Sequence, residues 1–313
     1  MIQLISLVIP VFNEEANLDN LISRCLTVCE KLQKNYEIIL VDDGSRDASV
    51  SKITQAAEKN PNKIIGLLLN RNYGQHAAVM AGFAEAKGDA IITLDADLQN
   101  PPEEIPKLVE QLDAGFEVVG SIRMNRQDSL FRRLSSKLVN TMVRQATGVN
   151  MHDYGCMLRG YQRHVIEAVL QCHERSTFIP VLANSFAHKT TEVQVEHAAR
   201  LDGDSKYSLW KLINLQFDLL TSITTLPLRL LTVMGGISAF LGIGFGVFLL
   251  IMRFIYGAEW AAKGVFTLFS VQFFFIGLQF MAMGLMGEYL GRIYNDVRAR
   301  PRYFVKAVVG RNE

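Results

Sequence analysis

The chain has 313 residues, a formal net charge of +1 and an apolar content of 49%. A charge so close to zero gives no global field for nucleic acid or a strongly acidic partner, and the apolar content is ordinary for soluble proteins. The apolar residues are unevenly placed: before about Leu226 the sequence is like that of a soluble protein, and two long uncharged runs follow.

The first part of the chain alternates predicted strands and helices. Short apolar runs predict strands at residues 4–9, 37–41, 64–69, 90–94 and 118–122. Asn13 is expected to cap the first intervening helix, and Ser45 or Asp47 the second; a third is expected over 74–86. Because the strands are continuous apolar runs rather than alternating ones, we expect an α/β fold with a mostly parallel sheet covered on both faces.

Two features bear on the compartment of this domain. Cys25 and Cys29 lie four residues apart in an amphipathic helical pattern, so we interpret them as small core residues in a reduced compartment. No Cys-x-x-Cys pair is present, which disfavours structural zinc. The N-terminus enters the first strand without a basic segment, so we expect no cleavable signal peptide and a cytoplasmic domain.

The second part of the chain predicts two membrane spans. Residues 230–252 and 265–287 contain no charge, and each can cross a hydrocarbon core of about 30 Å at about 1.5 Å per residue. The amphipathic stretch 207–229 is expected to lie along the membrane surface. Basic residues lie before the first span and in the tail, 288–313, so the positive-inside rule places both chain ends and the α/β domain, 1–206, in the cytoplasm.

Asp95-Ala96-Asp97 is the most specific motif in the sequence. Residues i and i+2 at a strand end point the same way, and two adjacent carboxylates form a hard oxygen site for Mg²⁺ or Mn²⁺. Such a metal can bridge a diphosphate and neutralise charge on a leaving nucleotide. Because the motif ends an apolar strand, we favour this interpretation over a solvated acidic loop.

Further polar residues follow neighbouring strands, where open α/β sheets bind their ligands. Asp42 and Asp43 can accept hydrogen bonds from uracil or ribose; an Asx turn with Gly44 is the alternative, and both can hold. The other polar residues that gather at these strand ends include Asn13, Glu14 and Arg71, and helix capping alone does not account for the whole cluster that follows the first strand.

Three other segments have less specific patterns. Asp153 lies two residues before Gly155, a setting more typical of a turn than of catalysis. Arg200 and Lys206 lie just before the surface segment, where they either grip the phosphate of a lipid or are attracted to anionic headgroups. A second basic group, also expected to face the membrane, consists of Arg123, Arg126, Arg132 and Arg133.

Together these parts predict a transfer reaction at a membrane surface. A soluble diphosphate donor would bind the α/β domain and a membrane-bound acceptor would reach it from the bilayer. A phosphate monoester is already anionic at neutral pH. It therefore needs positioning and charge cancellation rather than a base.

The motifs resemble those of a known family. Residues 10–15, 41–45 and 95–99, with two C-terminal spans, are similar to family 2 glycosyltransferases of the polyprenyl-phosphate type, such as dolichyl-phosphate mannose synthases and bacterial polyprenyl-phosphate glucosyltransferases. Longer strings resemble a subgroup that transfers a formamido-arabinose to undecaprenyl phosphate; these strings are residues 70–76, 98–106, 153–159, 172–180 and 287–294. The resemblance covers essentially the whole chain.

The resemblance implies a GT-A (Rossmann-like) domain, a UDP-linked donor, Mg²⁺ or Mn²⁺, and inversion at the anomeric carbon. It implies metal contact by Asp95, Asp97 and Gln99, with Asp97 also in the catalytic set, and it suggests Asp153 as a base or sugar-orienting residue. It implies uridine contacts around Pro10, Glu14, Asp42 and Asp43, and the predicted nucleotide-binding set is Pro10, Asn13, Glu14, Asp42, Asp43 and Arg71. For the acceptor phosphate it suggests Arg123, Arg132, Arg133, Arg200 and Lys206. It further implies a multi-pass protein of the bacterial inner membrane, a homo-oligomer such as a tetramer, and a product used for 4-amino-arabinose modification of lipid A and polymyxin resistance.

Three rival interpretations stay open. A polyprenyl-phosphate hexosyltransferase that uses UDP-glucose shares every motif except the longer strings. A lipid-carrier transporter is disfavoured because the two spans carry no charge, and an inactive scaffold is disfavoured by the intact Asp95 and Asp97. The sequence lacks the Gln-x-x-Arg-Trp string of processive synthases, so we expect a single transfer per acceptor.

Overall fold

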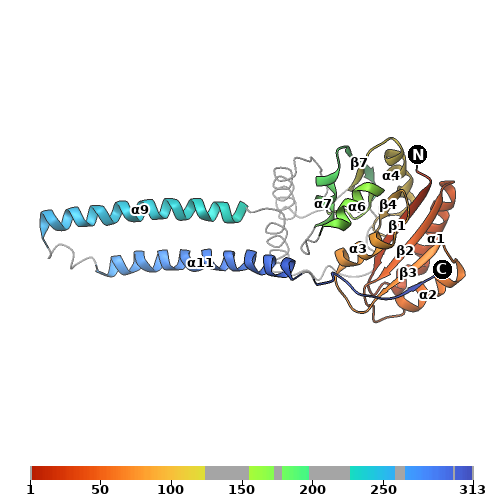
Figure 1. Ribbon diagram of the computed structural model, residues 1–313, viewed down its shortest axis with the longest axis horizontal. Helices are drawn as coiled ribbons and strands as arrows, with labels where there is room; N and C mark the ends of the chain where they lie inside the picture. Colours follow the sequence, from red (N-terminus) through yellow and green to blue (C-terminus); the bar gives the residue numbers. More distant parts are fainter. Residues whose placement is uncertain are drawn as a thin grey trace. The chain divides into compact units, whose positions relative to one another are not determined.

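The computed structural model describes residues 2–123, 155–172, 178–196, 226–257, 265–298 and 300–311. The chain divides into two compact units: Met1–Ile223 with Arg300–Glu313, and Thr224–Ala299. The first unit is a sheet with helices on both sides, and the second consists of two long helices (Figure 1).

The described strands of the first unit form one mixed sheet of eight strands in the order β7-β5-β6-β4-β1-β2-β3-β8. Strands β1 to β5 and β7 run in one direction, whereas β6 and β8 are antiparallel to their neighbours. The strands are β1 Leu4–Val11, β2 Asn35–Asp42, β3 Ile64–Leu69, β4 Ala90–Thr93, β5 Val118–Arg123, β6 Arg159–Gln162, β7 Thr190–Val195 and β8 Val305–Val309. The five predicted strands and their mostly parallel arrangement are confirmed, and β6, β7 and β8 were not foreseen.

Helices cover both faces of this sheet. Helices α1, α2 and α4 contribute to one hydrophobic cluster, and α3, α6 and α7 contribute to the other. Their bounds are α1 Glu15–Lys31, α2 Ser49–Lys59, α3 Gln75–Glu85, α4 Ile105–Asp113, α6 Arg163–Gln171 and α7 Ile179–Phe186, with a 3-10 turn, η1 Pro102–Glu104, before α4.

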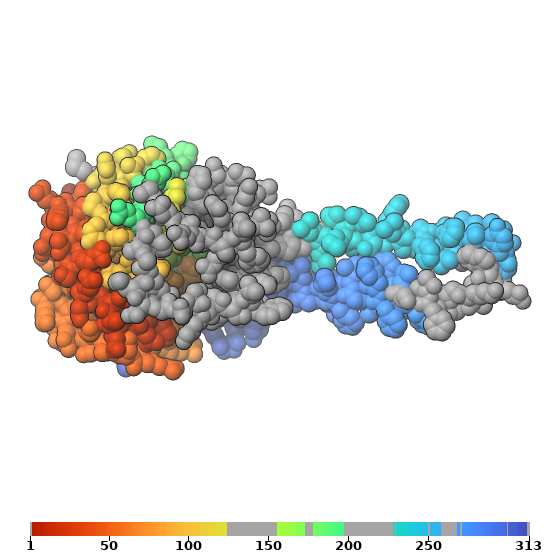
Figure 2. Space-filling model, turned by 180° about the vertical axis from the view of Figure 1, so that it is seen from behind, coloured from red at the N-terminus to blue at the C-terminus, as the bar shows by residue number. Residues whose placement is uncertain are grey.

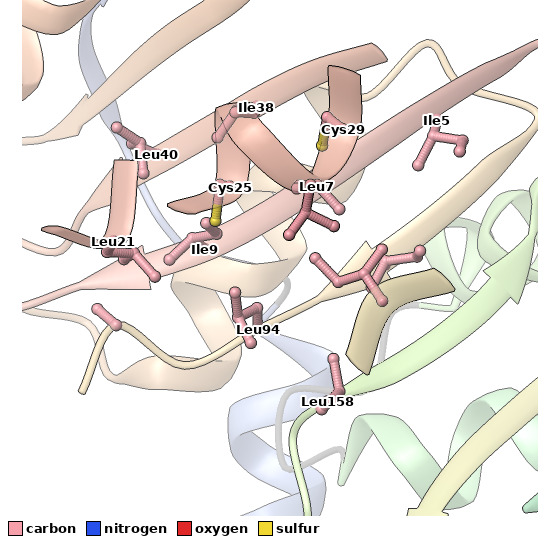
Figure 3. Packing of buried hydrophobic residues seen from close by; sticks show 14 of the residues in the cluster. Ile5, Leu7, Ile9, Leu21, Cys25, Cys29, Ile38, Leu40, Leu94 and Leu158 are labelled. Carbon is pink, nitrogen blue, oxygen red and sulfur yellow. The ribbon is translucent and has the colours of Figure 1, made fainter. Parts of the chain in front are cut away.

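The centre of the sheet shows why the sequence folds this way. Along β1, Leu7 and Ile9 belong to the cluster under α1, whereas Val8 between them belongs to the opposite cluster, as the alternation of a strand requires. Cys25 and Cys29 of α1 are buried free thiols that pack over Leu7 and Ile9 (Figure 3). Their prediction as small apolar core residues is confirmed.

The prediction that Asn13 caps the first helix is wrong. Helix α1 begins after Glu14, and Asn13 has a positive φ of 55°. The Asn13 carboxamide oxygen instead accepts from the backbone N–H of Arg46, 33 residues further along the chain. In the second loop, Asp47 Oδ1 accepts from Ser49 N at 3.0 Å, so Asp47 does bond to the first residue of α2.

The end of the chain returns to the sheet. Strand β8 pairs antiparallel with β3 at one edge. Arg311 then forms ion pairs with Glu37 and Glu85. The predicted tail 288–313 is therefore not a simple extension: it contains the last turns of α11 and a strand of the eight-stranded sheet.

The second unit contains α9, Leu226–Tyr256, and α11, Val265–Val297, which lie side by side (Figures 1 and 2). By length and composition, Leu230–Tyr256 and Val271–Val297 are candidate membrane spans, with mean hydropathies of 2.1 and 1.4. None of either apolar window is buried inside the protein, as expected for surfaces that face lipid. Of the predicted surface segment, 207–229, residues 207–225 lie outside the described part of the chain.

Candidate active site

The functional side chains predicted from the sequence gather at one edge of the sheet. Strands β1 to β5 are parallel to one another, so their carboxyl ends meet at the same edge. The loops after β1, β2, β3 and β4 begin there, and Arg123 ends β5 there. Pro10 lies in β1 beyond the last residue paired with β4, so its missing N–H removes no bond between those strands.

The loops after β1 and β2 are tied together by hydrogen bonds. Asn13 accepts from Arg46 N at 2.8 Å, and its own N–H donates to Ser45 Oγ at 3.0 Å. Glu14 N donates to Ser49 Oγ at 3.1 Å. These bonds join residues more than 30 positions apart, so they fix both loops as one unit.

Asp42 and Asp43 are buried, with exposures of 1% and 3%. Asp42 Oδ2 accepts from the N–H groups of Gly44, at 3.0 Å, and Ser45, at 3.2 Å, which is the Asx-turn alternative. Asp43 accepts from two backbone N–H groups of the loop before α3. A carboxylate has about four acceptor positions, so this turn leaves the nucleotide contact predicted for Asp42 open.

Asp43 holds the loop after β3. Its Oδ1 accepts from Tyr73 N at 2.7 Å, and its Oδ2 from Gly74 N at 2.9 Å. Burial raises the pKa of Asp43, and these two bonds oppose that rise. Gly44 has a φ of 72°, and a Cβ there would lie 2.5 Å from the carbonyl carbon of Arg71. The loops after β2 and β3 therefore touch backbone to backbone, which places Arg71 beside Asp42 and Asp43.

Asp95 and Asp97 lie just beyond β4, and both are partly buried. Leu98 takes a left-handed conformation with a φ of 59°, and Gln99 N donates to Asp97 Oδ1 at 3.1 Å. Gln75, the first residue of α3, donates from Nε2 to Asp95 Oδ1 at 2.6 Å. The two carboxylates are thus held by a turn and by a neighbouring helix.

The charges around Asp95 define the electrostatics of this edge. Burial, the neighbouring charge of Asp97 and a smaller contribution from Glu14 together raise the pKa of Asp95 to about 7. Arg123 and the bond from Gln75 oppose the rise. Four residues from separate parts of the chain therefore act on one carboxylate.

This donor set fits a divalent cation that is shared with a phosphate ligand. Two mutually repelling carboxylates would each be stabilised by a cation between them. In the described part of the chain no group of three or more His, Cys, Asp or Glu side chains converges on one point. Mg²⁺ in nucleotide sites is commonly held by one or two carboxylates, with substrate phosphates and waters completing the shell, so Asp95 and Asp97 suffice as the protein's acidic ligands.

Five predicted residues lie outside the described part of the chain: Asp153, Arg132, Arg133, Arg200 and Lys206. The segment that follows Asp153 is nevertheless fixed beside the motif after β4. Cys156 donates from Sγ to Asn100 Oδ1 at 3.6 Å, and Thr93 Oγ1 donates to the Met157 carbonyl at 2.5 Å.

Sequence reasoning missed two parts of this edge. Gln75 lies in the string 70–76 that carries the resemblance, but no role was predicted for it, although it bonds directly to Asp95. Arg300 and Arg302 were interpreted only as charges that set membrane topology, yet they line a cavity with the first turn of α3. The return of the chain after α11 is a long-range contact that no local pattern encodes.

Comparison with known proteins identifies the class. Residues 6–170 match the family described as glycosyl transferase family 2, and the chain belongs to this family. The match spans the sheet from β1 to α6, and so includes both Asp42–Asp43 and Asp95–Asp97.

Similar full-length proteins carry one name. The undecaprenyl-phosphate 4-deoxy-4-formamido-L-arabinose transferase of Photorhabdus laumondii is 62% identical over 312 residues, which cover 100% of this chain and 96% of that protein. The proteins of that name from Proteus mirabilis and Yersinia pestis are each 61% identical, covering 98% and 99% of this chain and 94% of their own lengths. With the two candidate spans, these relatives point to a membrane protein.

Solved structures agree on the fold. Glucosyl-3-phosphoglycerate synthase from Mycobacterium tuberculosis, in complex with Mn²⁺, uridine diphosphate and glucosyl-3-phosphoglycerate, aligns with a TM-score of 0.50 and 18% identity, over 71% of this chain and 80% of that one. The same enzyme in complex with phosphoglyceric acid aligns with the same score, identity and coverage. The GT-A-like sheet expected from the sequence is confirmed.

Proposed function

We propose that this chain transfers 4-deoxy-4-formamido-L-arabinose from a UDP donor to undecaprenyl phosphate, with inversion at the anomeric carbon. The observation that carries the proposal is the identity of 60–62%, over nearly the whole chain, to transferases of that name. Both aspartate pairs at the sheet edge are present and held in place, which supports an active enzyme rather than a scaffold.

The reaction is a single displacement. An oxygen of the lipid phosphate attacks the anomeric carbon, the bond from that carbon to the β-phosphate oxygen breaks, and UDP leaves with the bonding electrons. The phosphate monoester has a second pKa of about 6, so it enters as an anion and no proton has to be removed. The protein must therefore bring two anionic substrates together and cancel their charge.

The residues at the sheet edge divide this work. The joined loops with Asn13, Glu14, Asp42 and Asp43 form the cleft for uridine, and Arg71 lies at its border. Asp95 and Asp97, with Gln99, would hold Mg²⁺ or Mn²⁺. A bound cation supplies Lewis-acid stabilisation of the departing diphosphate. Arg123 lies beside this site as a positive charge for either substrate.

Asp153 is proposed to orient the sugar beside the anomeric carbon. Its segment supports this role, since Cys156, three residues later, is bonded to Asn100 in the loop that carries Asp95 and Asp97. Arg132, Arg133, Arg200 and Lys206 are proposed to attract the acceptor phosphate.

The proposed setting is the bacterial inner membrane. α9 and α11 would span it, with the sheet domain and both chain ends in the cytoplasm, where UDP-sugars are made. The assembly is proposed to be a homo-oligomer, such as a tetramer. The product would supply the sugar for 4-amino-arabinose modification of lipid A, which lowers surface negative charge and confers polymyxin resistance.

The test is transfer by the purified full-length protein in detergent, with undecaprenyl phosphate and radiolabelled UDP-sugars, with and without EDTA. We expect transfer of the formamido-arabinose and its loss with EDTA. Transfer of glucose alone would keep the mechanism and replace the donor with UDP-glucose. No transfer from any donor, by a folded protein with metal present, would refute the enzymatic proposal.

A further inference from the structure

A cavity of about 420 Å³ lies in the first unit, beside the proposed metal site. Its described lining comes from the loop after β3, the first turn of α3, the start of α7 and the segment after α11. The residues that carry the argument are Arg71, Gln75, His76, Arg300 and Arg302.

The side chains around this cavity have a strong charge bias. Arg71, Arg300 and Arg302 line it, and no carboxylate occurs among its described lining residues. Arg302 Nη2 donates to the Cys172 carbonyl, and a guanidinium carries five N–H donors, so this bond holds the side chain and leaves donors over. Arg71 stacks on the Tyr73 ring, 4.8 Å from its centroid. Arginines fixed in this way match phosphate geometry.

The start of α3 adds backbone donors to the same cavity. The helix has 11 residues, its N-cap Gly74 makes no side-chain capping bond, and its first turn contains no acidic residue. The N–H groups of the first turn of a helix have no partner within the helix, and together with the helix dipole they favour an anion. Gln75, His76 and Ala77, the first three residues of α3, all line the cavity.

His76 provides an independent sign of a missing partner. Its Nδ1 is buried and meets no hydrogen-bond partner among the described residues. The ring is held edge-on against Phe178, with centroids 5.6 Å apart. Buried polar side-chain atoms are nearly always bonded, so an orphaned nitrogen in the wall of a cationic cavity indicates that a ligand or a water completes it.

Gln75 connects the cavity to the reaction centre. It lines the cavity and donates to Asp95 at 2.6 Å, so one side chain separates the cavity from the proposed metal site. An anion in this cavity would therefore lie next to the departing diphosphate of the donor. Arg300 follows Val297, the last residue of α11, after only two intervening residues, so two of the arginines belong to the segment that follows a candidate membrane span.

We infer that this cavity binds the phosphate headgroup of the lipid acceptor, with Arg71, Arg300 and Arg302 as its cationic ligands and the first turn of α3 as its backbone donor. The inference rests on the proposed function and places the acceptor phosphate at residues other than those that the resemblance suggested for it, which are Arg123, Arg132, Arg133, Arg200 and Lys206. Arg300 and Arg302 act as binding residues, while Gln75 separates the two anionic sites.

The test measures binding and turnover separately in Arg300→Gln and Arg302→Gln. Farnesyl phosphate, a short lipid monophosphate, is titrated into the full-length protein without donor, and UDP with Mn²⁺ is titrated in a second experiment. We expect each variant to weaken farnesyl phosphate binding about tenfold and to raise the KM for undecaprenyl phosphate similarly, with UDP affinity within about twofold of the unaltered protein. Farnesol should not bind.

Arg298→Gln is the matched control, because it removes a charge at the same chain segment while Arg298 stacks on Tyr294 instead of lining the cavity. Arg302→Lys covers the case in which Arg302→Gln unfolds, and should retain part of the affinity. An equal loss of farnesyl phosphate affinity in Arg298→Gln would mean general attraction of basic residues to an anionic lipid. Weaker UDP binding with unchanged farnesyl phosphate binding would mean that the cavity binds the donor. Either result overturns the inference. Because the titrations need no turnover, they stand even if no donor is transferred.

Discussion

The two sides of the active edge satisfy their polar groups in opposite ways. On the proposed nucleotide side, Asn13, Asp42 and Asp43 accept hydrogen bonds from backbone N–H groups of neighbouring loops. On the proposed phosphate side, the pKa of Asp95 is raised beside Asp97, and His76 has a buried nitrogen without a described partner. The carboxylates of the first side therefore hold loops together, whereas those of the second repel each other.

This contrast predicts different consequences of mutation. Changes on the nucleotide side should cost stability, because they break bonds that hold the loops. Changes on the proposed phosphate side should cost activity and little stability, since the neighbouring charges of Asp95 and Asp97 repel each other in the folded protein.

The largest expected effect is on catalysis, in Asp95→Asn with Asp97→Asn. Loss of the proposed metal ligands should lower kcat/KM by about three orders of magnitude, since metal stabilisation is worth several kcal/mol and each 1.36 kcal/mol is tenfold. The midpoint temperature of thermal unfolding should be unchanged or raised. Asp19→Asn, at a side chain that is 75% exposed, is the control; a double variant with full activity would remove the metal assignment.

Asp43→Ala should show the converse. It leaves the buried N–H groups of Tyr73 and Gly74 without an acceptor, and each such group costs about 1–3 kcal/mol. We expect a loss of roughly 2–4 kcal/mol in the free energy of unfolding, measured by denaturant titration in detergent. Asp19→Ala, which breaks only a surface ion pair with Lys52, should cost less than about 1 kcal/mol. Equal losses in the free energy of unfolding in Asp43→Ala and Asp19→Ala would contradict the structural role of Asp43.

The pH dependence of metal binding tests the proposed role of Asp95 as a metal ligand. The pKa of Asp95 is about 7 without metal, so a proton must leave before a cation binds at lower pH. Mn²⁺ affinity, followed by loss of the free-ion electron paramagnetic resonance signal, should therefore fall about tenfold per pH unit below pH 7 and level off above it. A flat profile between pH 5 and 8 would contradict this assignment.

The raised pKa of Asp95 also determines whether stability rises or falls with pH. The folded protein without metal holds the Asp95 proton up to about pH 7, whereas an unfolded chain releases it near the ordinary value of 3.8. Between these values the folded state binds more protons, so stability falls as pH rises from about 4 to about 7. Asp95→Asn should show a shallower fall over this window.

The smallest effect is expected in Gln75→Ala. The bond from Gln75 lowers the pKa of Asp95, so its loss should move the acidic limb of the pH–rate profile to higher pH, with only a few-fold loss of activity at pH 8. Gln55→Ala, in the exposed face of α2, should leave the profile unmoved. An unshifted limb in Gln75→Ala would mean that Gln75 does not act through Asp95.

The parts that sequence predicted share a physical origin. Continuous apolar runs and the Asp95–Asp97 pair are local signals, and parallel strands bring their carboxyl ends to one edge whatever the loops do. The cap expected at Asn13 was wrong because its side chain bonds to Arg46, a partner no local window contains. Pairing between distant segments forms strands β6, β7 and β8 and the cavity with Arg300, so no local sequence pattern predicts them.

The most direct test of the proposed function is the identity of the nucleotide released when the purified protein acts on its UDP-sugar and undecaprenyl phosphate. Attack of the lipid phosphate on the anomeric carbon predicts one UDP for each lipid monophosphate sugar, quantified together by chromatography and mass spectrometry. Release of UMP with a lipid diphosphate sugar would place the attack on phosphorus and contradict the account.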